Sequence, residues 1–102
     1  MSSNFLWLQQ WYASQCDDDW EHQFGVLIRT IDNPGWQLQI DMEGTELLEL
    51  AFEPKTLERS EENWLHCWVA DHKFQAACGA ENLDEAIGLF REWAVSSVSH
   101  DS

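Results

Sequence analysis

Seven tryptophans and a formal net charge of −14 occur together in a chain of only 102 residues. Disordered acidic segments contain few aromatic residues, whereas here aromatic residues make up 13% and apolar residues 44% of the chain. That is enough apolar material for one packed core, so we expect a single domain over residues 1–102 with its acidic side chains outside. Such a surface repels nucleic acid and anionic lipid and attracts a basic partner.

The sequence shows no sign of membrane insertion or secretion. It has no apolar stretch of about 18 residues, and residues 1–4 lack the basic residues of a signal peptide. Its cysteines are odd in number and widely spaced, which favours reduced and mostly buried thiols: Cys16, Cys67 and Cys78. We therefore expect a cytoplasmic protein.

Hydrophobic periodicity predicts a helix at each end of the chain. The first covers residues 4–15 with Asn4 as its cap, and Trp7 lies off its apolar face. That face is expected to hold Phe5, Leu8, Trp11 and Tyr12. The second helix starts at Asn82, with Glu85 placed as in a capping box, and ends near residue 94. Residues 95–102 are then expected to be a frayed tail.

Four or five strands are expected between the helices, at residues 24–31, 36–42, 46–52, 64–70 and 73–77. The third is the weakest, because its sequence also suits a helix, and residues 53–62 are expected to be a loop. Asp32-Asn33-Pro34-Gly35 is typical of a type II turn and joins the first two strands in a hairpin. The whole pattern predicts an α+β domain, in which an antiparallel meander has both helices packed on one face.

The acidic residues fall into two dense groups. The first is Asp17, Asp18, Asp19 and Glu21, and the second runs from Asp41 to Glu62 with only Lys55 and Arg59 as bases. A solvated surface is the simple explanation, but like charges this dense cost stability, and a cationic partner would relieve their repulsion. The candidate partner-binding residues are Asp17, Asp18, Asp19, Trp20, Glu21, Asp41, Glu43 and Glu46, with Trp20 as an anchor buried in the interface.

Metal binding and catalysis have weaker support. Asp17 and Asp19 begin like a calcium loop, but its later glycine and glutamate are missing. The possible zinc ligands lack paired spacing: His22, His66, Cys67, His72 and Cys78. Acidic neighbours would suppress the thiolate that Cys16 needs to act as a nucleophile. We therefore expect no metal site, no cofactor and no catalytic residue.

The tryptophans divide by position. Trp11, Trp36 and Trp93 fall on expected inner faces and are assigned to the core. The others either pack internally or anchor an interface: Trp7, Trp20, Trp64 and Trp68.

Three segments carry a family resemblance. They are Trp7-Leu8-x-x-Trp11-Tyr12-x-x-x-Cys16-Asp17-x-x-Trp20-Glu21-His22, then Asp32-Asn33-Pro34-Gly35-Trp36, and then Trp64-x-x-Cys67. From about residue 5 to residue 93 the chain resembles the immunity protein 53 family of bacterial polymorphic toxin systems. The resemblance implies a small cytoplasmic α+β protein that protects the producing cell by binding a toxin encoded beside it.

The acidity of the chain suggests what kind of toxin this would be. A nuclease needs a basic surface, because contacts to phosphates dominate its affinity for substrate. An acidic inhibitor could cover that surface by stoichiometric binding, and electrostatic steering would speed the capture. The alternative is an acidic nucleic-acid mimic or adaptor that binds another basic protein.

Overall fold

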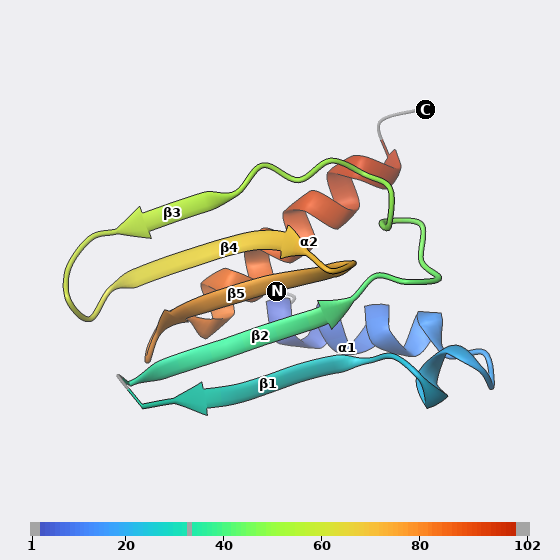
Figure 1. The fold of residues 1–102 in the computed structure, drawn as a ribbon, viewed down its shortest axis with the longest axis horizontal. Helices are drawn as coiled ribbons and strands as arrows, with labels where there is room; N and C mark the ends of the chain where they lie inside the picture. Colours follow the sequence, from blue (N-terminus) through green and yellow to red (C-terminus); the bar gives the residue numbers. More distant parts are fainter. Residues whose placement is uncertain (1–2, 33, 100–102) are drawn as a thin grey trace.

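The computed structural model describes residues 3–32 and 34–99 as one sheet with two α-helices (Figure 1). In chain order the elements are α1 (Asn4–Gln15), the 3-10 helix η1 (Trp20–His22), β1 (Val26–Ile31), β2 (Gly35–Asp41), β3 (Lys55–Glu58), β4 (Trp64–Ala70), β5 (Lys73–Gly79) and α2 (Leu83–Ser99). The expected α+β class is confirmed. Within the described ranges, no helix combines the length and apolar character needed to cross a membrane.

The sheet is antiparallel throughout, in the order β1-β2-β5-β4-β3. It differs from a meander in chain order because β5, and not β3, lies beside β2, with Leu38 opposite Ala76. Residues 42–54 carry the chain from β2 to the far edge, where β3 begins (Figure 1). Both helices contribute to one core on a single face of the sheet.

The strand expected at residues 46–52 does not form. Leu47 is fully buried and its neighbour Leu48 also packs against the core. Successive residues of a strand point to opposite faces, so this pair cannot both face the core from a regular strand. The segment instead forms turns, and pairing with β4 begins only at Lys55, inside the expected loop.

The core joins the inner face of the sheet to the two helices. Ile40, Leu65 and Phe74 come from the sheet and are fully buried, as is Phe90 from α2. The tryptophans assigned to the core do pack against it, although each stays partly exposed: Trp11, Trp36 and Trp93.

Helix α1 is rotated relative to the expectation. Its cap is Ser3 rather than Asn4, because the Ser3 Oγ accepts a hydrogen bond from the Leu6 N–H at 2.9 Å. Trp7, expected off the apolar face, packs against Phe90 with ring centroids 5.8 Å apart. Phe5 and Tyr12, expected in the core, are 56% and 36% exposed.

Helix α2 is longer than expected. It continues to Ser99, so residues 95–99 are helical rather than a frayed tail, and residues 100–102 lie outside the described residues. The Asn82 amide donates to Glu85 at 3.2 Å, but its carbonyl oxygen accepts from the Trp64 N–H at 3.3 Å. Asn82 therefore ties the start of α2 to β4, which a sequence-local capping box does not do.

The turn between β1 and β2 has a glycine at a position with no room for a side chain. Asn33 lies outside the described residues, and Gly35 begins β2 without the positive φ of a type II turn. A Cβ on Gly35 would collide with the carbonyl oxygen of Cys78 in β5. The glycine is required because two backbones approach closely there.

Candidate partner-binding surface

Two acidic segments, residues 17–21 and residues 41–46, meet at one end of the sheet (Figure 1). Antiparallel pairing places the start of β1 beside the end of β2, where the Gly25 N–H donates to the Asp41 carboxylate at 2.9 Å. The Trp20 indole N–H donates to the backbone oxygen of Glu43 at 2.6 Å. We name this region the acidic end, consisting of Asp17, Asp18, Asp19, Glu21, Asp41, Glu43 and Glu46.

Its first segment is held in one shape by its own carboxylates. Asp17 accepts hydrogen bonds from the N–H groups of Trp20 at 2.9 Å and Asp19 at 3.1 Å. Glu21 accepts from the N–H groups of Asp17 at 2.9 Å and Asp18 at 2.8 Å. The bond from the Trp20 N–H is the main cause that lowers the pKa of Asp17, and backbone N–H groups, its own first, lower the pKa of Glu21. Both groups therefore stay ionised below the usual titration range of carboxyl groups.

Trp20, predicted as an interface anchor, is buried within this chain. Its side chain is 6% exposed and lies in the protein's own aromatic cluster, with centroids 6.2 Å from Trp11 and 6.1 Å from Phe24. Gly44, with a φ of 79°, lies against the indole. The ring therefore fastens the two acidic segments together instead of projecting toward a partner.

The acidic residues differ in how far they are neutralised. Asp41 pairs with Lys73 at 3.1 Å, and Glu43 lies 2.9 Å from the His72 ring nitrogen. Asp18, Asp19 and Glu46 are exposed. These three carboxylates are the part of the acidic end that is best placed to meet a cationic protein.

Other acidic residues of the second dense group lie elsewhere. Glu61 and Glu62 line a hollow of about 550 Å³ together with Glu81 and Pro34. This hollow lies where β2 begins and β5 ends, at the opposite end of the strands from Asp41. The tertiary structure therefore divides a group that is continuous in sequence.

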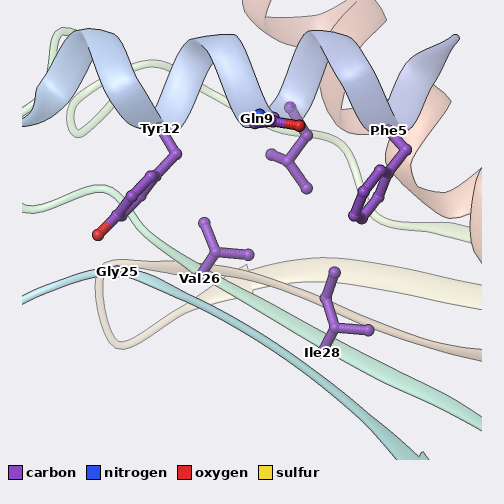
Figure 2. Close-up of a pocket in the computed structure, with 7 residues that line it drawn as sticks. Phe5, Gln9, Tyr12, Gly25, Val26 and Ile28 are labelled. Atoms are coloured by element: carbon purple, nitrogen blue, oxygen red, sulfur yellow. The ribbon is translucent and has the colours of Figure 1, made fainter.

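Sequence reasoning missed an apolar groove beside the acidic end. Phe5 and Tyr12 project from α1 toward Val26 and Ile28 of β1, and Gly25 closes one end (Figure 2). The groove has a volume of about 330 Å³. Its signal in the sequence was the spacing of Phe5 and Tyr12 on one helix face, which was assigned to the core.

A further aromatic group lies on the open face of the sheet. Leu65 and Cys67 of β4 are buried beneath the helices, so Trp64, His66 and Trp68 point to the opposite face. The Trp64 and His66 rings are 5.6 Å apart, and His66 lies 3.0 Å from Glu58. The role of Trp64 and Trp68 as interface anchors stays a prediction.

The residues weighed for metal binding and catalysis are dispersed. In residues 3–32 and 34–99, no group of three or more His, Cys, Asp or Glu side chains is arranged to hold a metal ion. His66 and Cys67 lie on opposite faces of β4, as their adjacency predicts. The thiols are free, with Cys67 and Cys78 buried and Cys16 exposed.

We expect iodoacetamide at about pH 8 to alkylate Cys16 in the folded protein and to spare the other two cysteines. Burial raises the pKa of Cys67, and it raises that of Cys78 to about 11, so only about one Cys78 in a thousand is thiolate at that pH. Peptide mass spectrometry would locate the label, and denatured protein, in which all three thiols should react, is the control. Equal labelling of Cys78 and Cys16 in folded protein would contradict the buried position of Cys78.

Comparison with known proteins places the chain in a family. The family model described as Immunity protein 53 matches residues 5–95, which include nearly all of α1, all five strands and most of α2. No curated protein and no solved structure matches the chain. The matched range covers the acidic end and the groove in full, and the chain belongs to the immunity protein 53 family.

Proposed function

We propose that this immunity-family chain neutralises a basic toxin of the nuclease type by binding it one to one and covering its nucleic-acid site with the acidic end. Membership of an immunity protein family implies a cognate toxin as partner and favours a non-enzymatic inhibitor. A nuclease must present cations to phosphates, so an acidic protein that occupies those cations competes directly with the substrate.

The observation that carries the proposal is the fixed meeting of the two acidic segments. The Trp20–Glu43 and Gly25–Asp41 hydrogen bonds, at 2.6 and 2.9 Å, tie both segments to one place. Folding therefore already brings these like charges together, at a cost in free energy from their repulsion. Binding of a cationic partner relieves that repulsion and is favoured by it. The backbone N–H groups of Asp18 and Asp19 are bonded to the carboxylates of Glu21 and Asp17, so this segment loses less backbone freedom on binding than a flexible one.

The test uses the toxin domain encoded beside this chain. We expect the two proteins to copurify, and we expect nuclease activity to fall to zero at about one equivalent of the immunity protein. Association should slow as salt rises, because at 0.1 M salt exposed charges more than about 10 Å apart are largely screened from each other. Bovine serum albumin, another acidic protein, is the control for non-specific charge effects. A stable complex that still cleaves nucleic acid would contradict occlusion, and the absence of a complex would contradict the proposed function itself.

A further inference from the structure

The groove beside the acidic end places apolar side chains next to the edge of the sheet. Phe5 and Tyr12 stand at its two ends on α1, Gln9 lies between them, and Val26 and Ile28 rise from β1 (Figure 2). Phe5 is 56% exposed, so much of its apolar surface is left for another segment to bury. The groove's volume of about 330 Å³ suits one or two apolar side chains of another segment.

Strand β1 is an edge strand, and its pairing with β2 shows which of its backbone N–H and C=O groups point outward. The Asp41 N–H donates to the Gly25 oxygen at 3.0 Å, so these opposite residues form a hydrogen-bonded pair. Bonded and non-bonded pairs alternate along antiparallel strands, so the next residue, Val26, and then Ile28 direct their N–H and C=O groups away from β2. The residues whose side chains line the groove therefore also present backbone donors and acceptors at the open edge.

The two edges of the sheet are protected to different extents. β3, at the far edge, carries Lys55 and Glu58 within four residues, and Lys55 lies opposite Cys67 on the core-facing side. Charges of this kind are a common defence against edge-to-edge pairing. β1 has Arg29 as the charged residue among its six. Of the two edges, β1 is the better template for an added strand.

The groove is electrically asymmetric. Gly25, which lines it, is bonded through its N–H to the Asp41 carboxylate at 2.9 Å, although the same carboxylate also pairs with Lys73. At the same end the phenol pKa of Tyr12 is raised, first by its hydrogen bond with Cys16 and in smaller part by the negative charge of Glu21. An occupant whose chain passes this end would be stabilised by a Lys or Arg side chain there.

We propose that β1 and the groove bind one extended segment of the toxin, which adds as a strand beside β1, inserts an apolar side chain between Phe5 and Tyr12, and places a basic residue at the Gly25 end. The inference rests on the proposed function and adds to it a main-chain mode of recognition. A second copy of this chain fits the groove less well, because its net charge is also −14 and the two copies repel each other.

The first test places a charge in the groove without touching the core. Gln9 is exposed and lines the groove, whereas its neighbour Gln10 is exposed and does not. We expect Gln9→Lys to weaken toxin binding at least about tenfold, because it repels the basic occupant, and Gln10→Lys to change binding by less than about twofold. Isothermal titration calorimetry with the toxin domain measures both variants.

The second test removes a backbone donor at the edge. Proline is tolerated where a strand's N–H faces away from its partner, so Ile28→Pro should keep the sheet but block pairing at the β1 edge. Its matched control is Thr56→Pro, because the same alternation, traced across the sheet from the Asp41–Gly25 bond, turns the Thr56 N–H outward from β3. We expect Ile28→Pro to weaken binding at least about tenfold and Thr56→Pro to leave it within about twofold.

Amide hydrogen exchange gives a readout that needs no substitution. In the wild-type complex, exchange at Ile28 should slow at least about tenfold relative to the free protein, whereas exchange at Thr56 should not change. Wild-type binding with no protection at Ile28 and unchanged affinity of Gln9→Lys would overturn the strand addition and leave the acidic end as the interface. Protection of Ile28 in the chain alone as its concentration rises would overturn it in favour of a second copy. If the wild-type protein does not bind the toxin, it is the proposed function that fails.

Discussion

Replacement of Asp18, Asp19 and Glu46 together by lysine is expected to slow association with the toxin by about ten- to hundredfold at low salt. The reason is that steering depends on the sign and density of charge where the partner approaches. The dissociation rate should change less than the association rate if these exposed carboxylates lie at the rim of the interface. Stopped-flow measurement of the association rate at several salt concentrations would check this.

The three positions are chosen because their side chains lie at the surface, although Asp18 has a φ of 76°, a conformation that aspartate adopts more readily than lysine. All are exposed, whereas Asp17 and Glu21 hold the backbone of their segment through hydrogen bonds of 2.8–3.1 Å. Reversal of Asp17 would therefore mix a structural effect with an electrostatic one.

The matched control changes the same net charge at the other end of the sheet. Glu61, Glu62 and Glu81 line the hollow next to Pro34, and the strands between the two ends span roughly 20 Å. Their joint replacement by lysine should slow association by less than about threefold at 0.1 M salt, where screening weakens charges that lie beyond about 10 Å. Equal slowing by both triple variants would mean that total charge, rather than the acidic end, governs capture.

Phe90→Ala is expected to lower the free energy of unfolding by about 3–5 kcal/mol, enough to unfold a large part of a marginally stable domain. Phe90 is 0% exposed and its ring meets those of Trp7, Trp11, Phe74 and Trp93, with centroids 5.1–6.1 Å apart. Truncation leaves a cavity where α1, α2 and β5 join, and no neighbouring backbone can close it without moving a helix.

Urea unfolding followed by tryptophan fluorescence measures this loss. The control is Leu6→Ala on α1, where the side chain is 46% exposed and the loss should stay below about 0.5 kcal/mol. A loss under about 1 kcal/mol for Phe90→Ala would contradict the central position of this ring.

Local pattern was sufficient for much of the fold. The alternation of apolar residues predicted β2, the strands expected at 64–70 and 73–77 correspond to β4 and β5, and the helix period predicted α1 at Asn4–Gln15. It was not sufficient for Leu47 and Leu48, where consecutive buried residues resemble a strand or a helix but pack as turns. Neither the helix period nor the strand period describes this segment, because its leucines are buried where they cover the open end of the core.

The candidate site divides in the same way. The sequence alone shows its acidic residues and Trp20, but it does not show in which direction the Trp20 ring points. The indole points inward because it packs against Trp11, Tyr12 and Phe24, and its N–H donates a hydrogen bond to the Glu43 oxygen. Phe5 and Tyr12 were placed in the core for the converse reason: a helical stripe records which residues share a face, but not which face meets the sheet.

By itself the sequence determined most of the core, the excess of negative charge, the family and the order of a helix, then strands, then a helix. Only the tertiary structure decided that β5 separates β2 from β4, that Asp17–Glu21 joins Asp41–Glu46 while Glu61 and Glu62 lie at the opposite end, and that β1 is left as an edge beside an apolar groove. The physical reason is that periodicity and charge density are properties of neighbours along the chain. Strand order and the meeting of distant segments depend on long-range packing, which no short stretch of sequence encodes.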